Sequence, residues 1–240
     1  MVNWNVKAEN VDEFLKTPEQ IYNIVDDEKL AIYYQFGINK TQHEENVLIV
    51  REAYPDKQST LSHNFNVGAL VMNANKLSIK NKSYIFLFGN FKEVFILGNM
   101  MRLFYHPEQF VLKKGSFITN QSKEHGYDNH ITIVNCTNIS PQKVSLNYIF
   151  KGRQNIIAQE YKNNEDLNLL YFGYGQKLKD KNYYCTREGY KDGSSAIIAH
   201  KLFKSHDEKM TDPQHFNRFG LIMGPKDEID KISNEEELRF

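Results

Sequence analysis

The feature that most constrains the fold is a long central stretch of short apolar runs. From Asn46 to Phe203 the chain repeats runs rich in Val, Ile, Tyr and Phe, each bounded by Asn, Gly, Asp or Lys. Short runs separated by turn-forming residues are typical of β-strands. The sequence therefore predicts an α+β, mainly β fold with a mixed or antiparallel strand-rich core.

The first 45 residues follow a pattern that favours helix. Apolar residues recur near helical spacing in Val11–Gln35, and Thr17-Pro18-Glu19 is typical of an N-cap followed by proline. Gly37 is expected to end a second helical piece. We find neither a linker nor a repeat at a fixed period. We therefore expect one compact domain over 1–240. The alternative is a domain of two lobes, a helical one at 1–45 and a strand-rich one at 46–240.

Two hairpins are predicted within the strand-rich part. Gly89-Asn90 is a turn signal inside the apolar segment Ser83–Gly98, and Gly152 is a turn signal between Val144–Phe150 and Asn155–Lys162. Met100–Tyr105 is expected to form a short helix. Further strands are expected at Val47–Val50, Val67–Met72, Phe110–Leu112, His130–Val134, Leu167–Phe172, Ala196–Phe203 and Phe219–Met223.

Charge and apolar patterning exclude several classes of protein. The formal net charge is zero, with 30 basic and 30 acidic residues, so any nucleic-acid surface must be a local patch. No apolar run is long enough for a secretory signal or a membrane span. The two cysteines, Cys136 and Cys185, lack CxxC spacing and are expected to be reduced. We expect a soluble, cytoplasmic protein, and a homodimer is compatible with this sequence.

The most suggestive catalytic pattern is Glu160-Tyr161-Lys162 at the end of the predicted strand that begins at Asn155. Residues i and i+2 of a strand share a face, so the carboxylate could bind Mg²⁺ while the ammonium orients a water. This pattern resembles the (D/E)xK half of the PD-(D/E)xK nuclease family. The resemblance implies a second metal-binding acid upstream, for which Asp128 is the candidate. The alternative is a solvated charge pair on an edge strand.

Other groups of polar residues offer weaker alternatives. Pro55-Asp56 matches the first half of the nuclease motif, but asparagines follow where an acid and a lysine belong. His130-Ile-Thr132 matches one half-motif of two-histidine phosphoesterases, and a second half-motif is absent from the sequence. A polar cluster near the C-terminus lacks helical zinc spacing and is better explained as a surface loop. Its members are His200, His206, Asp207, Glu208, Asp212 and His215.

The most basic and aromatic stretch of the chain lies between residues 171 and 201. Lysines can follow a phosphate backbone while tyrosine rings stack on bases. The alternative is a lysine-rich surface that covers aromatic strand residues. The residues expected to contact DNA or RNA are Lys177, Lys179, Lys181, Tyr183, Tyr184, Arg187 and Lys191.

The leading interpretation is a nucleic-acid-binding protein, with a Mg²⁺-dependent endonuclease as its catalytic form. In that form Asp128 and Glu160 would bind the metal, and Lys162 would assist the attacking water. The main rival is a non-catalytic β-rich binding or assembly protein, such as a viral or phage component or an inhibitor. A third hypothesis is a small-molecule enzyme with a pocket near residues 200–215.

Overall fold

The computed structural model contains two compact units, each built of antiparallel strands and its own helices. Unit 1 comprises Met1–Gln109 and unit 2 comprises Phe110–Phe240. The boundary expected after residue 45 falls inside the sheet of unit 1. The structure describes residues 1–40, 45–79, 84–102, 105–113, 117–118, 130–138, 146–163, 167–208 and 217–235.

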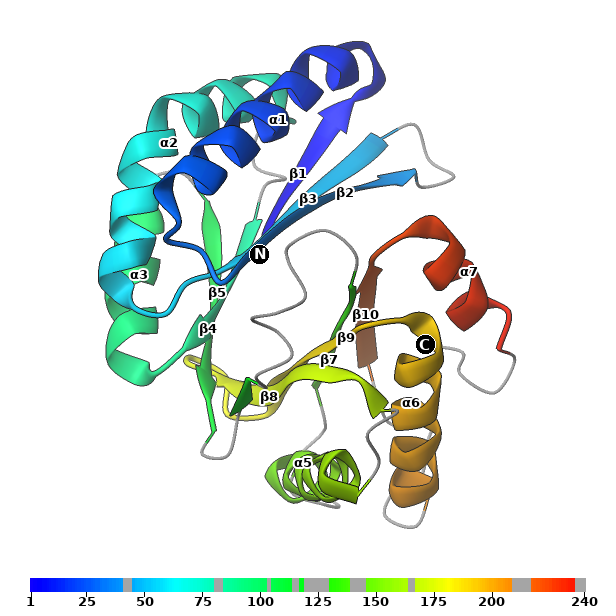
Figure 1. Cartoon of the computed structure of the whole chain (residues 1–240). Coiled ribbons are helices and arrows are strands. Elements are labelled where there is room, and N and C mark those ends of the chain that lie inside the picture. The colour runs from blue at the N-terminus through cyan, green and yellow to red at the C-terminus, as the bar shows by residue number, and fades with distance from the viewer. Residues whose placement is uncertain are drawn as a thin grey trace. The chain divides into compact units, whose positions relative to one another are not determined.

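Unit 1 is an antiparallel sheet with helices packed against it. Its strands lie in the order β4-β1-β3-β2, and helices α1 and α2 pack against each other and against β1 (Figure 1). The elements are β1 (Val2–Lys7), a 3-10 turn (Ala8–Asn10), α1 (Val11–Glu28), β2 (Tyr33–Lys40), β3 (Glu45–Ala53), α2 (Lys57–Leu77), β4 (Tyr84–Gly89) and α3 (Phe91–Met101).

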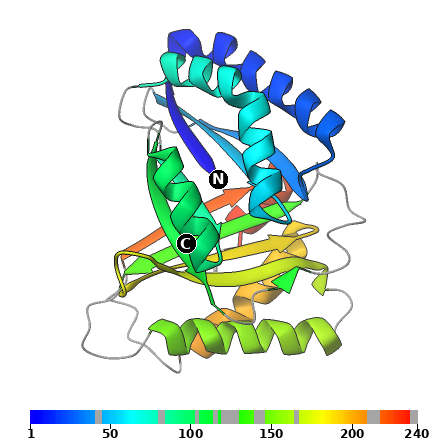
Figure 2. The ribbon, with the colours of Figure 1, turned by 90° about the vertical axis from the view of Figure 1, so that its left-hand side faces the viewer.

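Unit 2 has the same design. Its strands lie in the order β10-β7-β9-β8, again antiparallel, and α5 and α6 pack against each other beneath them (Figure 2). The elements are β7 (Ile131–Asn138), α5 (Leu146–Asn163), β8 (Leu169–Lys177), β9 (Tyr183–Tyr190), α6 (Gly193–Glu208), β10 (Asn217–Met223) and α7 (Lys226–Ser233). Two further strands, β5 (His106–Leu112) and β6 (Phe117–Ile118), pair with β8.

The two units repeat one order of elements. Apart from β5 and β6, each runs strand, helix, strand, strand, helix, strand, helix, with β1 beside β3 in unit 1 and β7 beside β9 in unit 2. This is the split β-α-β arrangement of ferredoxin-like folds. The α+β class predicted from the sequence is confirmed. The internal repeat was missed because the two copies share few residues.

Each unit has its own hydrophobic core between sheet and helices. In unit 1, α1 buries Phe14, Ile21 and Val25, which recur at helical spacing. In unit 2, α6 buries Ala196, Ala199 and Phe203 in the same way. No helix in the described ranges is long and apolar enough to cross a bilayer.

Several apolar runs predicted as strands are helices. Val67–Met72 lies in α2, Ala196–Phe203 in α6, and both arms of the second predicted hairpin fall on α5 as far as they are described. In these helices one face packs against the core, and this tertiary packing outweighs the preference of β-branched residues for strands. The Gly89-Asn90 turn is also wrong. Asn90 caps α3 instead, because its side chain accepts a hydrogen bond from the Glu93 amide at 3.1 Å.

Other predicted elements are confirmed, with changed limits. Strands occur at Val47–Val50, Phe110–Leu112 and Phe219–Met223, as expected, and strands outnumber helices in the described part of 46–223. The first predicted helix is real, but Pro18 lies in its interior and not at its start. The second helical piece is strand β2.

The prediction of two reduced cysteines is wrong in this structure. Cys136 on β7 and Cys185 on β9 lie directly opposite each other in the antiparallel pair, and they form a disulfide bond. Both side chains are fully buried. Their pairing depends on strand register, which the sequence spacing did not reveal.

Candidate active site

Each unit carries the same short sequence where its third strand ends. Unit 1 has Arg51-Glu52-Ala53-Tyr54, and unit 2 has Arg187-Glu188-Gly189-Tyr190. The Tyr54 hydroxyl donates to Glu52 Oε2 at 2.9 Å, and the Tyr190 hydroxyl lies 3.0 Å from Glu188 Oε2. Residues i and i+2 of a strand share a face, so the spacing itself brings each tyrosine to its glutamate.

An aspartate follows each motif and caps the next helix. Asp56 accepts a hydrogen bond from the Ser59 amide at 2.7 Å, and Asp192 accepts one from the Ser195 amide at 2.8 Å. Asp56, the rival candidate for a metal-binding acid, is therefore a helix cap. The two strings Arg-Glu-x-Tyr-x-Asp are the signal by which the repeat could have been found in the sequence.

In unit 1 the histidine on the following helix lies between two carboxylates. His63 Nδ1 is 2.9 Å from Glu28 Oε2 at the end of α1, and His63 Nε2 is 3.4 Å from Glu52 Oε2. Asn66 donates to the second oxygen of Glu28. The side chains of His63, Glu28 and Glu52 are 2%, 9% and 14% exposed. This forms a largely buried relay, Glu28–His63–Glu52–Tyr54.

Mutual charge sets the protonation of this relay. Burial acts to lower the pKa of His63, but the hydrogen bonds and charges of Glu52 and Glu28 outweigh burial and raise it. Burial acts to raise the pKa of Glu52, but His63 and the Tyr54 hydroxyl together lower it. His63 therefore lies between two carboxyl groups that both raise its pKa.

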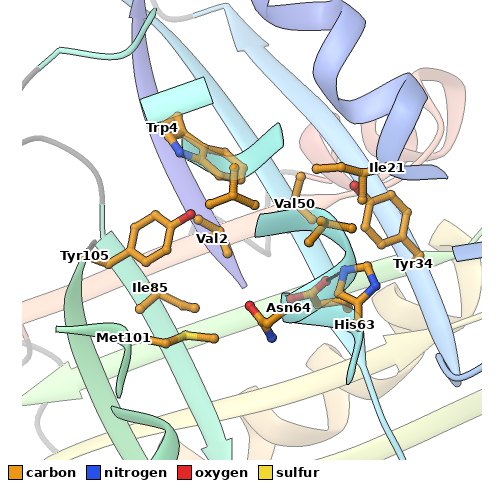
Figure 3. A pocket seen from close by; sticks show the side chains of 13 residues that line it. Val2, Trp4, Ile21, Tyr34, Val50, His63, Asn64, Ile85, Met101 and Tyr105 are labelled. Atoms are coloured by element: carbon orange, nitrogen blue, oxygen red, sulfur yellow. Dashed lines mark ion pairs between the residues drawn. The ribbon is translucent and has the colours of Figure 1, made fainter. Parts of the chain in front are cut away.

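The relay opens onto an apolar cavity within unit 1 (Figure 3). The empty space in and around the cavity amounts to about 350 Å³, a figure that includes open solvent, and about 20 Å³ of it can hold the centre of a water-sized molecule. Its polar wall is formed by Glu52, His63 and Asn64. The remaining lining is aromatic or aliphatic and comprises Val2, Trp4, Ile21, Tyr34, Val50, Val67, Val71, Ile85, Met101 and Tyr105.

Tyrosines around the cavity are held in the neutral form. Burial raises the pKa of Tyr34 and of Tyr54 above the ordinary range, and the charge of Glu52 raises both further. Burial likewise raises the pKa of Tyr105. All three hydroxyls therefore keep their protons at neutral pH, so each is able to donate a hydrogen bond.

Unit 2 contains a related but closed arrangement. Glu188 is fully buried, and His200 Nε2 lies 2.8 Å from its Oε2. Burial acts to raise the pKa of Glu188, but the charge and hydrogen bond of His200, the hydrogen bond of Thr186 and the charge of Arg153 together lower it. The ring of Phe203 packs on Phe172 at 5.7 Å between centroids. Phe172 on β8 and Phe203 on α6 thus pack against each other in the core of unit 2.

The residues predicted to be catalytic do not form the expected strand motif. Glu160 and Lys162 lie on helix α5, where residues two apart point to different sides. Glu160 is half-buried and Lys162 is exposed. Asp128 lies outside the described residues, so Mg²⁺ binding by Asp128 and Glu160 stays a prediction.

Some of the residues predicted to contact nucleic acid pack against other side chains within unit 2. Tyr184 is buried and its ring stacks on Phe150 at 5.8 Å. The Lys177 ammonium lies 5.0 Å from the centre of the Tyr183 ring. Tyr184 therefore cannot stack on a base without leaving the core.

The other basic residues of that stretch surround the β8–β9 hairpin. The Arg187 guanidinium lies 5.0 Å from the centre of the Tyr171 ring. Lys179, Lys181 and Lys191 are exposed, the first two in the turn and the third after β9. The alternative of a lysine-rich surface over aromatic strand residues describes this region.

Other candidate residues belong to unit 2 and are not part of the cavity lining. His130 is buried with its ring edge on Tyr171, and the Thr132 hydroxyl is 2.9 Å from the Tyr171 hydroxyl. His200 belongs to the closed cluster of unit 2, while Asp212 and His215 lie outside the described residues. No group of three His, Cys, Asp or Glu side chains in the described ranges is arranged to hold a metal.

Comparisons with known proteins identify the fold. No family model and no curated protein match the sequence. A solved structure from Lactobacillus acidophilus NCFM, provisionally described as a monooxygenase, aligns with a TM-score of 0.55 at 12% identity, covering 92% of this chain and 90% of that one. A second, from Fusobacterium nucleatum subsp. nucleatum and described in the same way, gives 0.53 at 15% identity, covering 93% and 92%.

These similarities correct the leading interpretation from the sequence. The fold is shared, along nearly the whole chain, with structures described as monooxygenases and not as nucleases. The nuclease, DNA-binding and hydrolase interpretations are therefore wrong. The nuclease interpretation depended on reading α5 as a strand, and the DNA-binding interpretation depended on the basic and aromatic stretch that forms β8, β9 and their turn. At such low identity the similarity establishes the fold alone.

Proposed function

We propose that this chain is a small-molecule monooxygenase whose active site is the cavity of unit 1. The observation that carries the proposal is the relay Glu28–His63–Glu52–Tyr54, buried and open to an apolar cavity. A few converging polar groups in an otherwise apolar pocket are typical of small-molecule sites. The description of the two similar structures as monooxygenases supports the reaction class.

Glu52 is the proposed general base. Its carboxylate lies 3.4 Å from His63 Nε2 and accepts a hydrogen bond from Tyr54. These contacts lower its pKa, so Glu52 is ionised at neutral pH and able to accept a proton from a substrate. A ligand that fills the cavity also removes solvent from Glu52, and desolvation raises the pKa of a carboxyl. Substrate binding therefore improves the base at the moment of use.

The cavity lining favours an electron-rich aromatic substrate with an acidic hydroxyl. Trp4 and Tyr105 offer ring surfaces, and aliphatic side chains complete the wall. Proton loss to Glu52 gives a phenolate, which can donate an electron to O₂. The resulting radicals combine to form a carbon–oxygen bond, and loss of water then gives a quinone. One oxygen atom enters the product and the other leaves as water, with all electrons supplied by the substrate.

Oxygen uptake with 1-naphthol tests this proposal. The full chain should consume one O₂ for each 1,4-naphthoquinone formed, above the rate in buffer. Glu52→Gln should lower the rate about 100-fold, since general base catalysis contributes that order. Glu9→Gln is the matched control, because its carboxylate is exposed in the same unit. No uptake by wild type, or equal uptake by Glu52→Gln, would contradict the proposal.

A further inference from the structure

One buried polar group that lines the cavity has no hydrogen-bond partner among the described residues. Tyr34 is 1% exposed, and its hydroxyl makes no hydrogen bond among the described residues. A buried hydroxyl without a partner costs stability. Tyr34 lines the cavity, and its hydroxyl end points toward the other lining side chains (Figure 3). The unused donor thus faces the space where a ligand would bind.

Strand register places this hydroxyl on the same side of the sheet as the proposed base. Tyr34 on β2 is directly opposite Glu52 on β3. Residues directly opposite in an antiparallel pair project to the same face. A ligand hydroxyl between them could donate its hydrogen to Glu52 while its oxygen accepts one from Tyr34.

The repeat shows that the hydroxyl is a specific feature of unit 1. In unit 2 the residue opposite Glu188 is Phe172, which has the same ring without the hydroxyl. Val67 on α2 follows the capping Asp56 by as many residues as Phe203 on α6 follows the capping Asp192, so the two positions correspond in the repeat. Unit 2 closes this region with two phenyl rings. Unit 1 has a smaller side chain on the helix and a phenol on the strand, so it has both space and a donor.

We propose that the Tyr34 hydroxyl donates a hydrogen bond to a ligand oxygen, and that the cavity selects small aromatic molecules that carry a hydroxyl over unsubstituted hydrocarbons. The proposal deepens the proposed function, since it names the substrate class of the same cavity. Tyr34 would also stabilise the phenolate that forms when Glu52 takes the proton, because a neutral phenol donates to the developing negative charge.

Binding of a matched ligand pair tests the proposal without turnover. Fluorescence titration under nitrogen would compare 1-naphthol with naphthalene, which has the same rings and no oxygen. Wild type should prefer 1-naphthol. Tyr34→Phe should weaken 1-naphthol binding about five- to tenfold, the loss expected for one hydrogen bond. Its affinity for naphthalene should stay within about twofold of wild type.

Two further variants make the test specific. Val67→Phe copies the ring of Phe203 into unit 1 and should abolish binding of both ligands. Tyr184→Phe removes a buried hydroxyl from unit 2 and should change neither affinity. Circular dichroism and thermal melts would establish that each variant is folded.

The outcomes separate this proposal from the proposed function. If Tyr34→Phe binds 1-naphthol as well as wild type does, Tyr34 is not the donor, and an ordered water is its partner instead. If wild type binds neither ligand, the assigned ligand class is wrong. If binding follows the expected pattern but no O₂ is consumed, the Tyr34 assignment stands and the monooxygenase proposal falls.

Discussion

The Tyr54 hydroxyl lies 2.9 Å from Glu52 Oε2, two residues earlier on the same strand face. The same contact recurs in unit 2 between Tyr190 and Glu188 at 3.0 Å. One local geometry is thus used twice, but only in unit 1 does it border the cavity described above. The Tyr–Glu contact itself is therefore alike in the two units, and the side chains that surround it are what differ.

Stability should depend on pH through His63 and Glu52. The pKa of His63 is raised in the folded state, so its contribution is full below the ordinary value of 6.5 and is lost as pH rises through the folded pKa. The pKa of Glu52 is lowered, so its contribution is present above 4.5 and is lost as pH falls through the folded pKa.

Thermal melts across pH check this expectation. The melting temperature should be highest between about pH 4.5 and 6.5 and should fall on both sides. His63→Gln should flatten the alkaline fall specifically, because it removes the group that loses its proton there. An alkaline fall of equal size in His63→Gln and wild type would count against a protonated His63.

Glu28 should act as a positioning residue for His63. Its carboxylate contacts Nδ1 of the ring, so Glu28→Gln should lower the pKa of His63 and destabilise the fold by about 1–3 kcal/mol. Imidazole NMR titration measures the pKa, and urea unfolding measures the stability. Asp26→Asn, on the same helix but exposed and paired with Lys29, is the control and should change neither. An unchanged His63 pKa in Glu28→Gln would show that Glu52 alone sets it.

The sequence predicted strands best where apolar runs lie on the sheet. Residues 47–50, 110–112 and 219–223 are strands as expected. It failed where a helix packs against the sheet, because Val67–Met72 and Ala196–Phe203 have compositions that suit either structure. Only tertiary packing decides between them.

The candidate site was beyond the reach of local patterns for a related reason. Glu28, Glu52 and His63 come from α1, β3 and α2, and only the fold brings them together. The sequence pattern predicted Glu160 and Lys162 as catalytic residues because residues two apart share a face of a strand. Both lie on helix α5, where residues two apart do not share a face. The repeated Arg-Glu-x-Tyr-x-Asp string was the one signal that the sequence did contain.

The Cys136–Cys185 disulfide should stabilise unit 2. It closes a loop with a sequence separation of 49 residues, so reduction should lower the free energy of unfolding by about 2–4 kcal/mol. Guanidinium unfolding with and without dithiothreitol measures the change, and thiol titration of unfolded protein counts free cysteines. The double variant Cys136→Ser, Cys185→Ser should not respond to dithiothreitol. Two free thiols in the untreated protein would show that the bond does not form.

Phe203 should be essential to the core of unit 2. Its side chain is 2% exposed and packs on both Phe172 and His200, with ring centroids 5.7 and 5.4 Å away. Phe203→Ala should therefore lower the free energy of unfolding by about 3–5 kcal/mol, the loss expected when a buried phenyl ring leaves a cavity. Phe65→Ala is the matched control. Phe65 is 91% exposed on α2, so its removal should change stability by less than about 0.5 kcal/mol. Urea unfolding followed by circular dichroism compares the two. Similar losses in both variants would mean that the packing of Phe203 on Phe172 and His200 contributes little to the stability of unit 2.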